Sequence, residues 1–193
     1  MRRAVCAIAI AAAACGPPSA GPIVQRLVDQ YAPGLPIGER LPDETRTRYK
    51  LRAAAYAGYA DDAFEGPDGV SGLVILMNPS PDDGVDEQIP GWARIRGVTL
   101  AARTPAIVAR VDARFRASMG TPTIQCYKAG FGEKVEIRFW PAERGRGVLL
   151  RVWGTRPGSA PPSGDHPADF GSADITFGAQ PVSPDRVTFE PCS

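Results

Sequence analysis

The sequence predicts an α+β fold in which helices pack on one face of an antiparallel sheet. Thr104 to Gly120 carries a full set of helix start and stop signals. Lys134 to Trp140 alternates apolar and polar side chains, which is typical of an antiparallel strand with one wet face. Short apolar runs bounded by glycine and proline recur elsewhere. The 193 residues can form one medium domain or two small ones.

Three helices are expected. Pro22 suits the first helical position, and apolar residues then recur with helical period up to Tyr31. A longer helix is expected from about Pro42 to Ala60, because this segment is rich in alanine. Its apolar stripe would consist of Tyr49, Ala53, Tyr56 and Ala60.

The best-specified helix is the third, from Pro105 to Met119. Thr104 is a good N-cap, and Gly120 supplies the stop. Its expected buried stripe is Ile107, Val108, Val111, Phe115 and Met119. Arginines, among them Arg110 and Arg114, lie on the opposite, solvated side.

Strands are expected around these helices. The first is the all-apolar run Leu73 to Met77, and the ambiguous segment from Trp92 to Leu100 is expected to be extended. The remaining strand candidates are Ile124 to Lys128, Lys134 to Trp140, Val148 to Trp153, and two short closing strands at Ile175/Phe177 and Val187/Phe189. Residues 79–91 and 155–170 are expected to be loops.

The N-terminus has the pattern of a secretory signal. Arg2 and Arg3 precede an uncharged run to Ala14, which is shorter than the ~20 apolar residues that span a bilayer. Ala12-Ala13-Ala14-Cys15 resembles the lipobox of bacterial lipoprotein precursors, in which the cysteine carries a diacylglyceryl group. The resemblance implies lipidation at Cys15 and a lipid-anchored protein, with the periplasmic side of the outer membrane as its location. The alternative is ordinary cleavage at an Ala-x-Ala site.

Residues 1–14 are therefore assigned to the signal, 15–21 to a Pro/Ser/Gly-rich tether, and 22–193 to one compact α+β body. Without Arg2 and Arg3, the 22 basic residues become 20, against 21 acidic ones, so the mature net charge is about −1. This balance argues against a nucleic-acid partner. Most basic residues are arginine. Codon bias in a G+C-rich genome is the expected explanation, and recognition of carboxylates or phosphates is the alternative.

The cysteine pattern predicts one disulfide. Cys6 lies in the signal and Cys15 is the proposed lipidation site, which leaves Cys126 and Cys192. An even pair in an exported protein is expected to be oxidised. We therefore expect a Cys126–Cys192 bond and a largely buried Cys126. Two cysteines without a neighbouring histidine do not form a metal site, and no cofactor is expected.

A faint internal repeat relates residues 35–79 to residues 95–153. Gly38-x-x-Leu41-x-x-x-Thr45 lines up with Gly97-x-x-Leu100-x-x-x-Thr104, each followed by an expected helix and strand. Such modules are similar to those of BamE-type outer-membrane lipoproteins and of tandem β-lactamase-inhibitor proteins. The resemblance implies a binding or scaffolding module rather than an enzyme.

Candidate catalytic and metal-binding residues are few. His166, the only histidine, lies in a Pro/Gly-rich loop beside Asp165 and Asp169, and no Gly-x-Ser-x-Gly elbow accompanies it. The run from Asp82 to Glu87 has oxygen ligands suited to Ca²⁺ but lacks the EF-hand spacing. A surface histidine and a solvated acidic loop are therefore the expected interpretations.

Aromatic and arginine residues give a candidate interaction surface. Trp140 is out of phase with Val135, Ile137 and Phe139, so it points away from them beside Arg138, and Trp153 lies near the end of the next strand. An exposed face with Arg138, Trp140 and Trp153 would suit a protein partner. In the other interpretation, a second layer covers this face and makes it core.

The sequence thus leads to a non-catalytic envelope lipoprotein that binds or scaffolds another protein. It would use either the Arg138/Trp140/Trp153 face or the arginine-rich side of the Pro105–Met119 helix. The competing hypothesis is a periplasmic hydrolase or small-ligand-binding protein with a site near His166.

Overall fold

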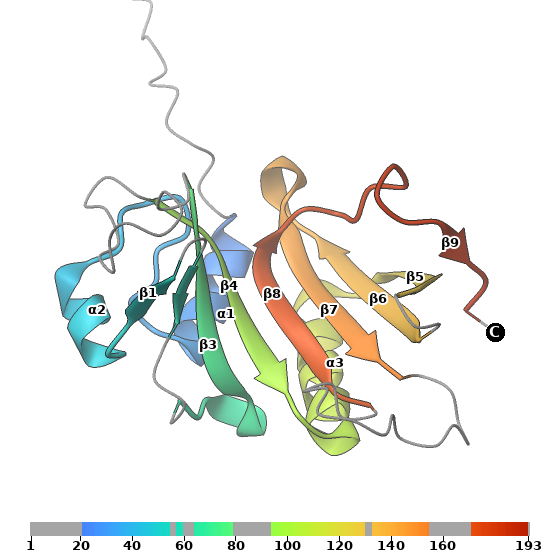
Figure 1. The fold of residues 1–193 in the computed structure, drawn as a ribbon, viewed down its shortest axis with the longest axis horizontal. Helices are drawn as coiled ribbons and strands as arrows, with labels where there is room; N and C mark the ends of the chain where they lie inside the picture. Colours follow the sequence, from blue (N-terminus) through green and yellow to red (C-terminus); the bar gives the residue numbers. More distant parts are fainter. Residues whose placement is uncertain are drawn as a thin grey trace, which may run out of the picture.

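The structure is a computed structural model that describes residues 21–54, 57–59, 64–78, 94–129, 133–154 and 171–192. In this part, the chain forms one antiparallel sheet with helices on one face, which confirms the predicted α+β class (Figure 1). The signal, Cys15, the tether up to residue 20, the acidic run 82–87, Trp92 and His166 lie outside the described residues.

The sheet has nine strands in the order β1-β2-β3-β4-β8-β7-β6-β5-β9. Its late strand β8 lies between β4 and β7 and is antiparallel to both. The strands are β1 (Arg52–Ala54), β2 (Ala57–Tyr59), β3 (Ser71–Asn78), β4 (Arg94–Ala102), β5 (Thr123–Lys128), β6 (Lys134–Pro141), β7 (Gly147–Trp153), β8 (Ala173–Ala179) and β9 (Phe189–Glu190). Seven of them, β3 to β9, contain or overlap the expected strands.

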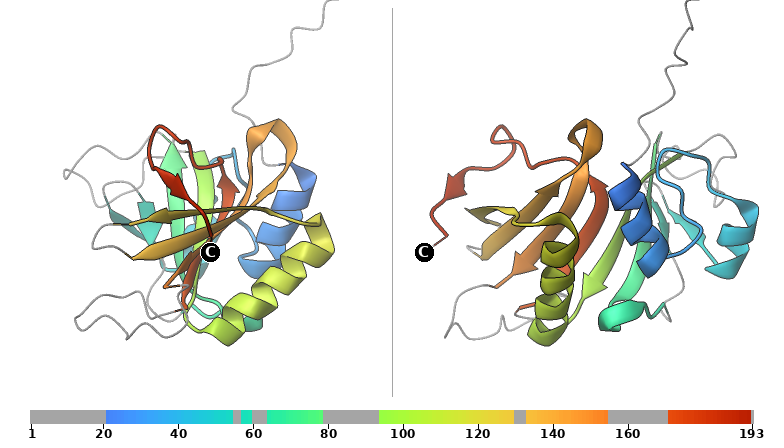
Figure 2. Two further views of the ribbon diagram at one scale, coloured as in Figure 1. Left: turned by 90° about the vertical axis from the view of Figure 1, so that its right-hand side faces the viewer. Right: turned by 180° about the vertical axis from the view of Figure 1, so that it is seen from behind.

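Three α-helices accompany the sheet: α1 (Pro22–Tyr31), α2 (Asp43–Arg48) and α3 (Pro105–Met119). Short 3₁₀ turns are η1 (Pro67–Gly69) and η3 (Glu143–Gly145). Helices α1 and α3 lie on the same face of the sheet (Figure 2). The predicted start and end of α3 are confirmed, because the Thr104 hydroxyl accepts a hydrogen bond from the Ile107 amide and Gly120 has φ +83°.

The expected helix from Pro42 to Ala60 is wrong. Helix α2 ends at Arg48, and Lys50 then adopts a left-handed conformation that no helix interior contains. The chain continues into the β1–β2 hairpin, and β2 pairs with β3. Pairing with the sheet thus overrides the helix propensity of the alanines. The two halves of the proposed repeat consequently differ, with six helical residues in one and 15 in the other.

Four aromatic side chains form the centre of the main core. Tyr31 of α1, Phe115 of α3 and Phe177 of β8 contact one another, with ring centroids 5.7–6.0 Å apart. The Trp140 ring of β6 lies 5.4 Å from that of Phe115, edge to face. Edge-to-face packing of this kind adds to the stability gained from burial alone.

The β6–β7 region is covered on both faces. Trp140, Val148 and Leu150 pack in the main core on the helix side. On the opposite face, Ile137, Phe139 and Leu149 form a second small core, against which residues of the C-terminal segment pack. The expectation of one wet face on β6 is therefore wrong, because the polar side chains Glu136 and Arg138 lie toward α3 and are largely buried.

The buried Tyr31 hydroxyl makes the stability of the fold depend on pH. It donates a hydrogen bond to Asp68 Oδ2 at 2.7 Å. Burial, then this hydrogen bond and the charge of Asp68, raise the pKa of Tyr31 well above its ordinary value of 10.0, against a smaller opposing effect of Arg114. Tyr31 in the unfolded chain therefore loses its proton at lower pH than in the fold, so the stability linked to it is complete below pH ~10 and decreases above that value.

We expect the free energy of unfolding to fall by up to about 1.4 kcal/mol for each pH unit above ~10. The variant Tyr31→Phe should lack this part of the alkaline dependence. Urea unfolding of both proteins between about pH 8 and about pH 11 measures the difference. Parallel pH profiles for the two proteins would contradict the assignment.

Candidate functional site

An arginine-lined groove of about 720 Å³ lies on the sheet face opposite α1 and α3. Its floor is formed by the outward side chains of β4, β8 and β7, such as Thr99, Thr176 and Leu149. These positions alternate along their strands with residues of the main core. The segment from Gln180 to Val187, which follows β8, forms one wall of the groove.

The floor of the groove depends on a close approach between β4 and β8. Thr99 and Thr176 are opposite each other, and their hydroxyls lie 3.1 Å apart at hydrogen-bonding distance. Gly178 has φ +75°, and a Cβ there would lie 2.9 Å from the carbonyl oxygen of Arg96. Only glycine combines this backbone conformation with so short an approach.

The charges in the groove are unbalanced. Its lining includes four arginines, Arg96, Arg146, Arg151 and Arg186, and one acidic residue, Asp174, so its formal net charge is +3. The whole chain, in contrast, has a formal net charge of +1. Positive charge is therefore concentrated in this groove, which favours an anionic ligand or partner.

Most of these arginines have no acidic partner in the described part of the chain. Arg146 donates to the backbone carbonyl of Arg96 at 2.8 Å. The Arg151 guanidinium lies over the Trp153 ring, 5.9 Å from its centroid. The Arg151 Nε is buried and has no hydrogen-bond partner among the described residues. Among the described residues, no ion pair involves Arg96, Arg151 or Arg186. Their guanidinium groups therefore retain donors for an external anion.

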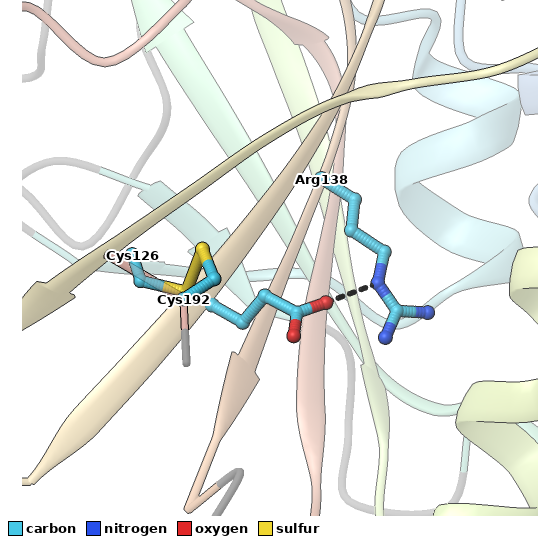
Figure 3. Close-up of a disulfide and its surroundings, with 4 residues drawn as sticks. Cys126, Arg138 and Cys192 are labelled. Carbon is cyan, nitrogen blue, oxygen red and sulfur yellow. Dashed lines mark hydrogen bonds and ion pairs between the residues drawn. A yellow bond between two sulfur atoms is a disulfide. The ribbon is translucent and has the colours of Figure 1, made fainter. Parts of the chain in front are cut away.

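The predicted Cys126–Cys192 disulfide is present, with a Cα–Cα distance of 5.2 Å (Figure 3). Cys126 is 1% exposed, as expected. The bond lies beside the short pairing of β5 with β9, which places Phe189 opposite Tyr127. Phe189 and Val182 pack against the second core. The disulfide therefore fixes the far end of the segment that forms the groove wall.

The expected exposed face with Trp140 is wrong. The Trp140 side chain is 0% exposed, and its indole N–H donates to the Gly120 carbonyl at 2.8 Å. Helix α3 and its C-terminal turn cover this face, so the alternative interpretation as core is confirmed. The covering layer is α3, whereas the C-terminal segment covers the opposite face of β6.

Arg138 lies on the same side as Trp140 but is engaged within the protein. It pairs with Asp112 of α3 at 3.0 Å and with Glu136 at 2.5 Å, and its side chain is 22% exposed. Burial by itself lowers the pKa of Arg138, but the hydrogen bonds and charges of Glu136 and Asp112 outweigh that effect and raise it. Arg138 thus joins β6 to α3.

Trp153 is not brought together with Arg138 and Trp140. It is half-buried on the opposite sheet face, where its indole N–H donates to Asp174 at 3.3 Å. On the arginine-rich side of α3, Arg110 and Arg114 are exposed to solvent, and they bind the backbone and the carboxylate of Asp68. Of the expected interaction residues, Trp153 alone is adjacent to the groove, through Arg151.

A second cavity, of about 510 Å³, lies between α1 and α2. The Gln25 side chain in its lining donates to the Leu35 carbonyl and accepts from the Ile37 amide, and it thereby supports the loop between the two helices. The described residues contain no cluster of three or more potential metal ligands. None of the helices described is both long and apolar enough to cross a membrane.

Comparison with known proteins identifies no relative of this chain. The chain matches no protein-family model, no curated protein and no solved structure. The resemblance to BamE-type lipoproteins and to β-lactamase-inhibitor modules therefore stays a prediction.

The burial of Trp140 predicts a large effect of its removal. We expect Trp140→Ala to lower the free energy of unfolding by about 3–5 kcal/mol, because it opens a cavity beside Phe115. Trp140→Phe should cost less, since one ring remains, although the hydrogen bond to Gly120 and part of the ring volume are lost. Urea unfolding measures both variants, and a loss below about 1 kcal/mol for Trp140→Ala would indicate a surface position.

The disulfide should contribute strongly to stability. Its loop spans 66 residues, for which the loop-closure model gives ~4 kcal/mol. We expect Cys126→Ser with Cys192→Ser to lower the free energy of unfolding by about this amount. A reducing agent should destabilise the wild type similarly and leave the double variant unchanged. Free thiols at both positions in a non-reducing peptide map of the exported protein would contradict the pairing.

Proposed function

We propose that this protein is a non-catalytic lipoprotein of the cell envelope that binds another protein through the arginine groove. The observation that carries the proposal is the net charge of +3 in a groove whose arginines have so few acidic partners. Guanidinium groups fixed on a rigid sheet are well suited to recognising carboxylates, because little ordering of the site is needed on binding.

The oxidised cysteine pair supports an extracytoplasmic location. Disulfides persist in oxidising compartments such as the periplasm and are rare in the cytosol. The lipobox-like segment before Cys15 and the following Pro/Ser/Gly-rich tether agree with this location. In the proposed arrangement, the lipid holds the protein at the periplasmic side of the outer membrane, and the tether separates the body from the bilayer.

The side chains that line the groove support a non-catalytic role. Among the described lining residues, the only carboxylate is Asp174, and the indole of Trp153 donates to it. A hydrolytic site needs a nucleophile or activated water next to a base, and the hydroxyls of Thr99 and Thr176 bond each other instead. These contacts favour binding over catalysis at this position.

The lipid anchor can be tested with two cysteine variants. We expect the wild-type protein in the membrane fraction of its native host, with a diacylglyceryl group on Cys15 in mass spectra. Cys15→Ala should move the protein to the soluble fraction, whereas the matched variant Cys6→Ala should stay with the membrane. A mature N-terminus downstream of Cys15, without lipid, would end the anchor proposal.

Partner binding can be tested by crosslinking in native membranes. A photo-reactive amino acid at Gln180, on the groove wall, should capture a defined protein. The same group at Ala109, exposed on the far side of α3, serves as the control and should not. Recovery of the protein alone from both positions would refute the proposed function.

A further inference from the structure

The form of the groove indicates what kind of partner segment it accepts. Arg151 lies on β7, and Arg146 lies just before Gly147, where β7 begins. The backbone from Arg151 to Gly147 covers four residue steps, about 13 Å along the strand, and Arg146 lies one step farther. The Arg146 guanidinium is held at the Arg96 carbonyl, whereas that of Arg151 lies over the Trp153 ring beyond the opposite end of the row. A single phosphate or carboxylate spans only a few ångströms, so it does not reach both groups.

Leu149 separates the two ends of the β7 row. It lies between Arg151 and Gly147 on the same face, and the hydroxyls of Thr176 and Thr99 follow it across the sheet. Leu76, Val182 and Val187 also line the groove. Along β7, the lining thus has cationic ends with an apolar residue between them. A complementary ligand needs separated negative charges with an apolar group between them.

An extended peptide provides this spacing. In an extended chain, side chains on one side recur every ~6.6 Å, so residues four apart are ~13 Å apart. Acidic residues at least four positions apart, with an apolar residue between them, match Arg151 at one end of the groove, Leu149 between the ends and Arg146 at the other end. We propose that the arginine groove binds an extended, acidic peptide segment of the protein partner. This inference rests on the proposed function and specifies the chemistry of the partner.

A direct binding measurement can test the inference. The purified full-length chain, in detergent, is titrated into a fluorescently labelled peptide of about ten residues in which glutamate and valine alternate. We expect saturable binding that weakens between about 50 mM and about 300 mM salt, because the contacts are ionic. A peptide of the same composition, with glutamates and valines in two blocks, should bind at least about fivefold more weakly.

Groove variants and a matched control identify the site. Arg96→Gln and Arg151→Gln should each weaken binding of the alternating peptide about tenfold, as expected for loss of a charge-assisted hydrogen bond. Arg26→Gln removes an exposed arginine of α1 outside the groove and should change binding less than about twofold. Arg151→Lys should recover only part of the binding. Unchanged circular dichroism and melting temperature show that each variant is folded.

Other anions provide the outcomes that would overturn the inference. If inorganic phosphate binds at the groove and the peptide does not, the site accepts a small anion. If vesicles of anionic phospholipid bind with the same dependence on Arg96 and Arg151, and the peptide fails to compete, the groove meets a membrane surface. Equal binding of the alternating and block peptides would also refute an extended segment.

The same variants separate this inference from the proposed function. Suppose that crosslinking captures a partner and that Arg96→Gln with Arg151→Gln captures it equally well. The protein is then a partner-binding lipoprotein, but the acidic-peptide inference is wrong. If peptide binding depends on the groove while no partner is captured in membranes, the proposed function fails instead.

Discussion

The contacts among Tyr31, Phe115, Phe177 and Trp140 determine how the elements of this fold are placed. One ring comes from each of α1, α3, β8 and β6, and Phe115 contacts the other three. Because Phe177 points to the helix side of β8, its neighbours Thr176 and Gly178 belong to the groove. The packing that fixes both helices on one face thus places the groove on the other face of β4, β8 and β7.

The two faces of β6 and β7 are covered by different parts of the chain. Helix α3 covers Trp140 and engages Arg138 through Asp112. The C-terminal segment covers Ile137, Phe139 and Leu149 from the other side. Leu149 belongs both to this second core and to the groove lining, so the groove begins where the C-terminal cover ends. Stability and the shape of the site therefore depend on the same segment.

Local signals were sufficient to predict much of the fold. Both ends of α3 follow from residues at or next to them, namely Thr104, Pro105 and Gly120. The apolar run predicts β3, and the alternation of apolar and polar residues predicts β6. The 42–60 segment was mispredicted because its alanines favour a helix, whereas pairing of β2 with β3 determines its structure. That pairing is a tertiary contact that no local pattern reveals.

The site was harder to predict than the fold. Trp140 alternates with Val135, Ile137 and Phe139, and this alternation correctly predicts that it lies on the opposite face of β6. The alternation does not indicate which of the two faces α3 covers. The disulfide followed from counting cysteines. The groove brings Arg96, Arg151 and Arg186 together from β4, β7 and the C-terminal segment, and it requires the non-sequential order β4-β8-β7. Nothing in the spacing of these arginines indicates that order.

The position of β8 has a consequence for how the chain reaches this structure. Thr99 and Thr176 meet across the sheet although 77 residues separate them, so β4 and β8 pair only after most of the chain is available. Until then, β4 and β7 each have an unpaired edge that can pair with other chains. A chain synthesised from its N-terminus holds these two edges open until the last strands arrive. The centre of the finished sheet is therefore the region most exposed to aggregation during folding.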